Sequence, residues 1–220
     1  ASRARLEVTG YPTRPELSAW DRASGRAHLG LDAEGPVLLI TGGSKGAQSI
    51  NRAVLAVLPQ LLEVAQVLHL AGQAGWSEVS AAAAQLPPTL AGRYHPMPYL
   101  HEMGAALAAA DLVVSRAGAS VLGEYPLFGL PAVLVPYPYA WRYQKVNAGY
   151  LVEQGAALLV KDEDLAGDLL TTVRGLLTNP ARLATMKNNM RSLARPQAAE
   201  QIADLVRQTA RQHPSAGGNA

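Results

Sequence analysis

Residues 42–47 (Gly-Gly-Ser-Lys-Gly-Ala) directly follow the apolar run Val37–Thr41 and precede a helical pattern. Glycines after a strand allow a tight turn and a close approach of the backbone to a ligand, and the next helix offers free N–H groups at its N-terminus. This arrangement suits a phosphate or diphosphate, to which the hydroxyl of Ser44 adds a donor. The pattern is not a Walker A loop, because glycine rather than Ser or Thr follows the lysine. A plain strand-to-helix turn explains these glycines equally well.

A second loop, residues 115–124, also follows an apolar run, at the carboxyl end of a strand where open α/β sheets bind ligands. Gly118 and Ala119 would let backbone N–H groups face a ligand. Glu124, one turn into the following helix, can accept two hydrogen bonds from a vicinal diol such as that of a ribose. Taken alone, Glu124 is better explained as an acidic residue that stabilises a helix N-terminus.

A third loop, residues 136–148, is rich in Pro and Tyr and follows another apolar run. Gln144 and Asn147 are three residues apart on the expected helix, so their amides can share a face and bond to sugar hydroxyls. The aromatic residues of the loop can contact a sugar or a partner, or can simply pack. Arg14 can pair with a phosphate in a bidentate manner, although a single loop arginine is usually only solvated.

The histidines do not point to catalysis or to a metal. The five are His28, His69, His95, His101 and His213, and their spacing is not that of metal ligands. His69 lies within an apolar run and is expected to be a packed strand residue rather than a base. No nucleophile elbow or Ser–His–Asp order is present. The chain offers binding groups without a general base, so the catalytic residues are unassigned and no cofactor is expected.

These loops need a scaffold that brings strand ends together. Short apolar runs bounded by Gly or Pro are found at residues 37–41, 67–70, 93–97, 111–114, 132–135 and 157–160. Helical patterns separate and follow them, at residues 47–62, 77–85, 101–109, before Pro131, from Tyr143, and at 165–177, 181–193 and 197–211. The alternation predicts an α/β fold with a doubly wound, Rossmann-like parallel sheet of about six strands.

Composition excludes several classes of protein. The 220 residues include no Cys, which excludes a disulfide scaffold and a Cys-ligated zinc or iron–sulfur site. Lys and Arg number 19 against 17 Asp and Glu, and no dense basic stripe interleaved with aromatics indicates nucleic acid as a partner. No apolar run reaches the length of a membrane span. We therefore expect a soluble, cytoplasmic chain.

We expect three parts along the chain. Residues 1–35 would be a linker and the start of the main domain, and residues 36–212 would form the Rossmann-like main domain, which ends in helices. Residues 213–220, rich in small residues, would be a disordered tail. The chain starts without Met and inside a loop pattern, so we expect it to be part of a longer protein.

Taken in order, the motifs resemble the C-terminal half of the MurG family. These are bacterial UDP-N-acetylglucosamine (UDP-GlcNAc) transferases that act on undecaprenyl-linked muramoyl-pentapeptide. The resemblance covers residues 10–207. It rests on residues 10–14, 42–47, Asn51, residues 99–103, 115–124, 129–131 and 144–148. Each motif is modest, whereas the ordered set is specific.

The resemblance implies the donor half of a GT-B glycosyltransferase, which has two Rossmann-like domains. Arg14 and Ser44 would hold the diphosphate, and the backbone of Leu100 would read the uracil. Glu124 would bind the ribose hydroxyls, and Gln144 would touch the GlcNAc hydroxyls. The residues implied in donor binding are Arg14, Gly43, Ser44, Leu100, Met103, Gly118, Ala119, Ser120, Val121, Glu124, Gln144 and Asn147.

The implied reaction is transfer of GlcNAc from UDP-GlcNAc to the C4 hydroxyl of lipid-linked muramoyl-pentapeptide, with inversion, which converts lipid I to lipid II in peptidoglycan synthesis. A helix dipole and hydrogen-bond donors would stabilise the leaving UDP without a metal. The family's N-terminal acceptor domain lies outside this chain, so residues 1–220 should bind UDP-GlcNAc without transferring it. The full-length protein would lie peripherally on the cytoplasmic face of the cell membrane.

Some positions depart from the family pattern, and other functions stay open. Tyr11 and Tyr143 are unusual for the family, and Pro126 removes an N–H that would bond to Leu122, so it could tilt its helix. The alternatives are a separate donor-binding subunit of a two-chain transferase, a UDP-sugar epimerase-like domain, or an NAD-binding Rossmann domain. An NAD site needs an acidic residue after the second strand, where residues 71–73 are Ala-Gly-Gln.

Overall fold

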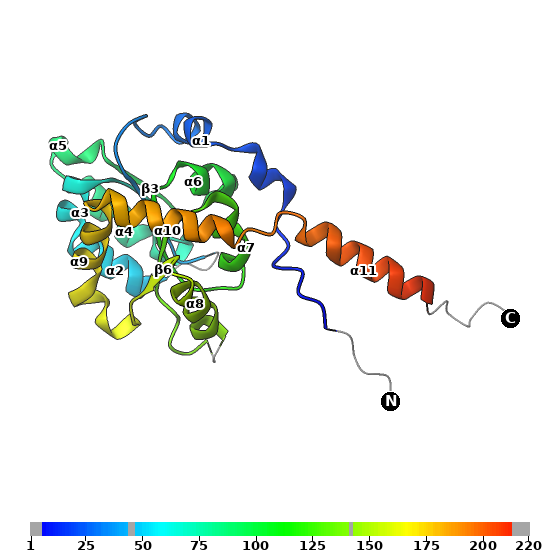
Figure 1. Cartoon of the computed structure of the whole chain (residues 1–220). Coiled ribbons are helices and arrows are strands. Elements are labelled where there is room, and N and C mark those ends of the chain that lie inside the picture. The colour runs from blue at the N-terminus through cyan, green and yellow to red at the C-terminus, as the bar shows by residue number, and fades with distance from the viewer. Residues whose placement is uncertain (1–5, 44–46, 141–142, 213–220) are drawn as a thin grey trace, which may run out of the picture.

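One parallel sheet organises the molecule (Figure 1). The computed structural model describes residues 6–43, 47–140 and 143–212. The sheet order is β3-β2-β1-β4-β5-β6, and every neighbouring pair is parallel. The strands are β1 (Val37–Thr41), β2 (Gln66–Leu70), β3 (Tyr94–Met97), β4 (Leu112–Ser115), β5 (Ala132–Leu134) and β6 (Ala157–Leu159). The expected doubly wound α/β fold is confirmed, with each strand end within one residue of its expected position.

Helices cover both faces of the sheet. On one face, α2 (Gln48–Ala56), α3 (Leu58–Val64), α4 (Trp76–Ala84) and α9 (Leu165–Leu177) share an apolar cluster with β1. On the other face lie α6 (Met103–Ala109), α7 (Val121–Phe128) and α8 (Tyr143–Glu153), with α1 (Arg22–His28) packed on α6. The remaining helices are α5 (Pro88–Ala91), α10 (Pro180–Ser192), α11 (Ala198–Gln212) and the short 3-10 helices η1 (Pro15–Ala19), η2 (Gln73–Gly75) and η3 (Asp162–Asp164). Because both faces are covered, β1 and β2 are buried along their whole length, which explains the apolar run of β1. In β2 the polar side chains of Gln66 and His69 are buried as well, and both are hydrogen-bonded.

The single helix expected at residues 47–62 is wrong. The chain forms two helices there, α2 and α3, which meet at Val57. Pro59 lies in the first turn of α3. Proline has no N–H to donate and its ring collides with the carbonyl four residues earlier, so a helix cannot continue through it unbroken. The break lets both helices turn apolar residues, including Val54 and Leu61, onto the same face of the sheet.

Residues 6–35 contain the helices η1 and α1, in the part of the chain where we expected a linker and the start of the domain. Asp21 caps α1 by accepting the N–H of Ser24 at 2.8 Å. Arg26 in α1 is only 2% exposed, and it donates to the carbonyls of Ala33 at 2.7 Å and Gly35 at 2.9 Å. It also pairs with Asp111 at 2.9 Å, next to the start of β4. These contacts of Arg26 attach α1 to the sheet. The polar sequence of residues 21–28 does not predict them.

The segment around Gly10 passes close to the connection between α10 and α11. Gly10 has φ +94, and a Cβ placed there would lie 2.7 Å from Cβ of Arg195. From this connection α11 extends away from the rest of the domain (Figure 1). The helical pattern at residues 197–211 is therefore confirmed, whereas the tail at residues 213–220 lies outside the described residues.

Candidate nucleotide-sugar site

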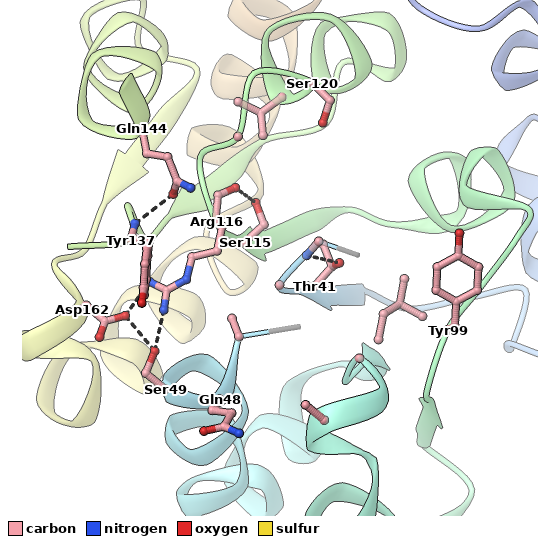
Figure 2. Close-up of a pocket in the computed structure, with 18 of the residues that line it drawn as sticks. Thr41, Gln48, Ser49, Tyr99, Ser115, Arg116, Ser120, Tyr137, Gln144 and Asp162 are labelled. Carbon is pink, nitrogen blue, oxygen red and sulfur yellow. Dashed lines mark hydrogen bonds and ion pairs between the residues drawn. The ribbon is translucent and has the colours of Figure 1, made fainter. Parts of the chain in front are cut away.

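A cavity of about 1050 Å³ opens at the carboxyl edge of the sheet (Figure 2). The neighbours β1 and β4 lie at its centre, and from this pair the chain winds outward in both directions. Loops that leave two such strands diverge, so open α/β sheets form a crevice at this point. The cavity is within the size range of sites for small organic ligands and cofactors.

The β1 side of the cavity is the glycine turn. Gly42 and Gly43 line the cavity, and the side chain of Thr41 accepts the N–H of Gly43 at 3.2 Å. Gly43 has φ +77, a conformation that favours glycine. Ser44, expected to contact the diphosphate, lies outside the described residues. Gln48 and Ser49, at the start of α2, complete this side of the cavity.

The β4 side is the turn into α7. Gly118, Ser120 and Val121 line the cavity. Hydrogen bonds from Val121 to Gly118 and from Leu122 to the carbonyl of Ala119 close the turn at 3.3 and 3.1 Å. Within the described part of the chain, the N–H groups of residues 118–120 have no protein acceptor. Free N–H groups at the positive end of a helix dipole favour an anion.

Glu124 is half-buried and lines the cavity from the first turn of α7. Burial raises the pKa of its carboxyl, while the positive charge of Arg14 and a hydrogen bond from Ser120 oppose the rise. Arg14 is exposed and does not line the cavity, but its charge reaches Glu124. Residues 11–13 hold it there: a Cβ at Gly123 would lie 2.9 Å from the carbonyl oxygen of Tyr11.

The two amides of α8 have different surroundings. The Oε1 of Gln144 accepts the N–H groups of Tyr137 at 2.9 Å and Ala117 at 3.3 Å, and the side chain lines the cavity (Figure 2). Among the described residues its Nε2 has no partner, so this group is available to a ligand hydroxyl. Asn147 donates to the carbonyl of Ala117 at 3.0 Å and does not line the cavity. Asn147 therefore holds the β4 loop in place instead of facing the ligand space.

An ion pair at the far end of the cavity was not expected from the sequence. Arg116, only 12% exposed, is ion-paired with Asp162. Its guanidinium also donates to the hydroxyl of Ser49 at 2.7 Å and lies over the ring of Tyr137, 5.2 Å from the centroid. Ser49 in turn donates to Asp162 at 2.7 Å. The only sequence signal is that Arg116 and Asp162 each follow a strand of the same parallel sheet.

Eight of the twelve residues that the resemblance implied line this one cavity. They are Gly43, Leu100, Met103, Gly118, Ser120, Val121, Glu124 and Gln144. Three others, Arg14, Ala119 and Asn147, lie next to it without lining it, and Ser44 is outside the described residues. Leu100 and Met103 lie beyond β3, at the opposite end of the cavity from Asp162, and pack against the core. The cavity thus has an apolar end, a centre with free N–H groups and a polar end.

No group of three or more His, Asp or Glu side chains among the described residues could hold a metal ion. In the same part of the chain, no helix has the length and apolar character needed to cross a membrane.

The model of the glycosyltransferase family 28 C-terminal domain matches residues 37–203. The chain belongs to this family. Residues 37–203 contain every described lining residue of the cavity. The family 28 match confirms the resemblance on which the expected function rests. It favours a glycosyltransferase domain over the alternative of an NAD-binding Rossmann domain.

Named relatives agree with the family 28 assignment. A transferase from Roseiflexus sp. named UDP-N-acetylglucosamine–N-acetylmuramyl-(pentapeptide) pyrophosphoryl-undecaprenol N-acetylglucosamine transferase is 46% identical over 92% of this chain and 50% of its own length. The protein of the same name from Acidothermus cellulolyticus is 45% identical over 91% of this chain and 56% of its own length. The crystal structure of Acinetobacter baumannii MurG superposes with a TM-score of 0.73 at 30% identity, over 90% of this chain and 57% of that one. The chain therefore spans about half the length of these relatives.

Proposed function

We propose that this chain is the donor-binding half of an inverting N-acetylglucosaminyltransferase that uses UDP-GlcNAc. The observation that carries the proposal is the cavity at the β1–β4 crevice, where the N–H groups of residues 118–120 have no acceptor among the described residues. They lie beside the half-buried carboxylate of Glu124 and the Nε2 of Gln144, which has no partner among the same residues. The N–H groups suit the diphosphate, Glu124 the ribose diol and the Nε2 of Gln144 a sugar hydroxyl. Leu100 and Met103 form the apolar end, which suits the uracil.

In this proposal the donor-binding domain comprises residues 36–212. The helix α1, which precedes β1 in the sequence, packs against this domain. The names of the relatives supply the acceptor: undecaprenyl-linked muramoyl-pentapeptide. An N-terminal acceptor domain would bind that substrate on the cytoplasmic face of the membrane. It would act either as part of the same longer chain or as a separate subunit.

In the proposed reaction the acceptor's C4 oxygen forms a bond to C1 of GlcNAc as the bond from C1 to the β-phosphate oxygen breaks. The electron pair of the broken bond leaves with UDP, and the hydroxyl proton passes to a base in the acceptor half. Negative charge grows on the β-phosphate as it leaves. The N–H groups before α7 and the dipole of that helix stabilise this charge, which lowers the barrier.

Calorimetric titration of the 220-residue chain with UDP-GlcNAc, UDP, UDP-glucose and NAD tests the proposal. Binding of UDP-GlcNAc and UDP without NAD is the expected result, and tighter binding of UDP-GlcNAc than of UDP-glucose would place sugar selection in this half. Addition of the N-terminal half of a relative in trans should then produce transfer to the lipid-linked acceptor. Failure to bind any uridine nucleotide, both alone and with that half present, would contradict the proposal.

A further inference from the structure

Three buried polar side chains form a chain of hydrogen bonds behind the wall of the cavity. The hydroxyl of Tyr94 lies 2.8 Å from Nδ1 of His69, and Nε2 of His69 lies 3.0 Å from Oδ1 of Asn51. Asn51 then donates from Nδ2 to the carbonyl of Ala71 at 2.9 Å. Asn51 is 1% exposed and His69 is 0% exposed. Burial lowers the pKa of His69 to about 4, so the imidazole is neutral near pH 7.

The donor and the acceptor in each of these hydrogen bonds follow from the backbone carbonyl of Ala71, on which the series of bonds ends. The carbonyl of Ala71 can only accept, so the amide nitrogen of Asn51 faces it and the amide oxygen faces His69. His69 must then carry its proton on Nε2, which leaves Nδ1 as an acceptor for the hydroxyl of Tyr94. Both ring nitrogens of His69 and both polar atoms of the Asn51 amide therefore have a hydrogen-bond partner, and such a satisfied buried network is rigid.

The chain of bonds ends on residues 71–75, which form part of the cavity wall. Gly72 and Ala74 line the cavity, and the N–H of Gly75 closes the turn on the carbonyl of Gly72 at 3.1 Å. Asn51 lies directly under this turn, since a Cβ at Gly75 would come within 2.1 Å of its Nδ2. Asn51 also belongs to α2, whose first turn lines the cavity. One side chain therefore couples two walls.

We propose that Asn51, His69 and Tyr94 are positioning residues of the donor site, which hold the turn at residues 71–75 against α2 so that the cavity keeps its width. None of the three lines the cavity. The inference rests on the proposed function, because the ligand whose fit depends on this width is the nucleotide. A purely structural role predicts loss of stability alone, whereas a positioning role predicts loss of affinity in a domain that is still folded.

Asn51→Ala is the first test, with Gln66→Ala as its matched control. Gln66 is also a buried amide that bonds to loop backbone, accepting the N–H of Asp32 at 2.7 Å, but it lies at the opposite end of β2. Both variants should lose a similar amount of stability in urea. We expect the affinity for UDP, measured by calorimetry, to fall about tenfold in Asn51→Ala and to stay within about twofold in Gln66→Ala. Equal affinities in the two variants would overturn the inference.

A second pair disturbs the turn without removing a polar group. Gly75→Ala forces a methyl group onto Asn51, whereas Gly92→Ala puts one into open space, and both glycines have negative φ. Only Gly75→Ala should weaken UDP binding, and unchanged binding in it would contradict the inference even if Asn51→Ala does not fold.

Long-range proton–nitrogen spectra of the wild-type chain should show His69 protonated on Nε2, and protonation on Nδ1 would overturn the hydrogen-bond chain. Wild-type chain that binds no UDP would refute the proposed function together with the inference, whereas wild-type binding that these variants leave unchanged would refute the inference alone.

Discussion

Gln144 has two tasks in the proposed site, and two substitutions separate them. Its Oε1 accepts two backbone N–H groups and so joins the β4 and β5 loops, while its Nε2 is available to the sugar. Gln144→Glu keeps an acceptor for both N–H groups and removes the donor. Gln144→Ala removes both functions. Both variants therefore remove the hydrogen bond to the sugar, whereas only Gln144→Ala removes the acceptor that joins the two loops.

The expected magnitudes follow from these contacts. Gln144→Ala leaves the N–H of Ala117 unpaired, and because Ala117 is fully buried this should lower the free energy of unfolding by about 1–3 kcal/mol. Tyr137 is 45% exposed, so water can satisfy its N–H at little cost. Loss of the Nε2 donor removes one neutral hydrogen bond of about 0.5–1.5 kcal/mol, so both variants should lower the preference for UDP-GlcNAc over UDP about two- to tenfold.

The assay is calorimetric titration with UDP-GlcNAc and UDP, together with urea unfolding. The ratio of the two affinities reports on the sugar. Free UDP carries more negative charge than UDP-GlcNAc, so the new carboxylate of Gln144→Glu repels UDP more strongly, and a fall in the preference for UDP-GlcNAc cannot come from charge repulsion. An unchanged ratio in both variants would refute the sugar contact. A loss of stability in Gln144→Glu as large as that in Gln144→Ala would refute the role of Oε1 in joining the loops.

Four further predictions concern charge. Glu124→Ala should weaken UDP binding by about 1–3 kcal/mol through loss of the ribose contact, and unchanged affinity would remove this residue from the site. Arg14→Ala should weaken UDP much more than uridine, and equal effects would contradict a diphosphate role. Arg26→Ala should lower the free energy of unfolding in urea by about 3–5 kcal/mol, because it leaves buried acceptors without a donor. Arg22→Ala removes an exposed partner of the same Asp111 and should lower it by less than about 1 kcal/mol. Similar losses in the two variants would refute the role of Arg26 as a buried anchor. Burial lowers the pKa of His69 in the folded state from its ordinary value of 6.5 to about 4. The contribution of the neutral imidazole to stability is therefore complete above about pH 6.5 and is lost as the pH falls toward about 4. Urea unfolding without any such loss would contradict the burial of His69 as the neutral form.

The strands and the family were readable from local sequence. A parallel strand buried on both faces favours a near-continuous apolar run, so Val37–Thr41 stands out without any tertiary information. The helix at Leu165–Leu177 was predicted with its observed ends because its apolar residues repeat at the helical period and Asn-Pro follows it. Within residues 47–62 the same periodicity predicted one helix instead of two, because a new helix begins just before Pro59 while the apolar pattern continues unchanged.

Side-chain roles were predicted less well than positions. Gln144 and Asn147 share one helix face, yet only Gln144 reaches the cavity, because the carbonyl of Ala117 takes the amide of Asn147. Nothing in the local pattern shows which of two amides a neighbouring loop will engage. His69 was correctly expected to be a packed strand residue, but its partners Asn51 and Tyr94 lie on other elements and could not be identified.

The sequence alone determined the order of the strands along the chain, the placement of glycine turns and polar residues at strand ends, and through the ordered motifs the glycosyltransferase family. These are local properties, since burial and turn geometry act on a few consecutive residues. Only the tertiary structure decided that Arg116 pairs with Asp162, that Arg26 anchors α1 to β4, and that Asn51 holds the turn at Ala71. Each of these contacts joins segments far apart in the sequence. The surrounding fold buries the paired groups, and the low local dielectric strengthens their interaction, which no local pattern encodes.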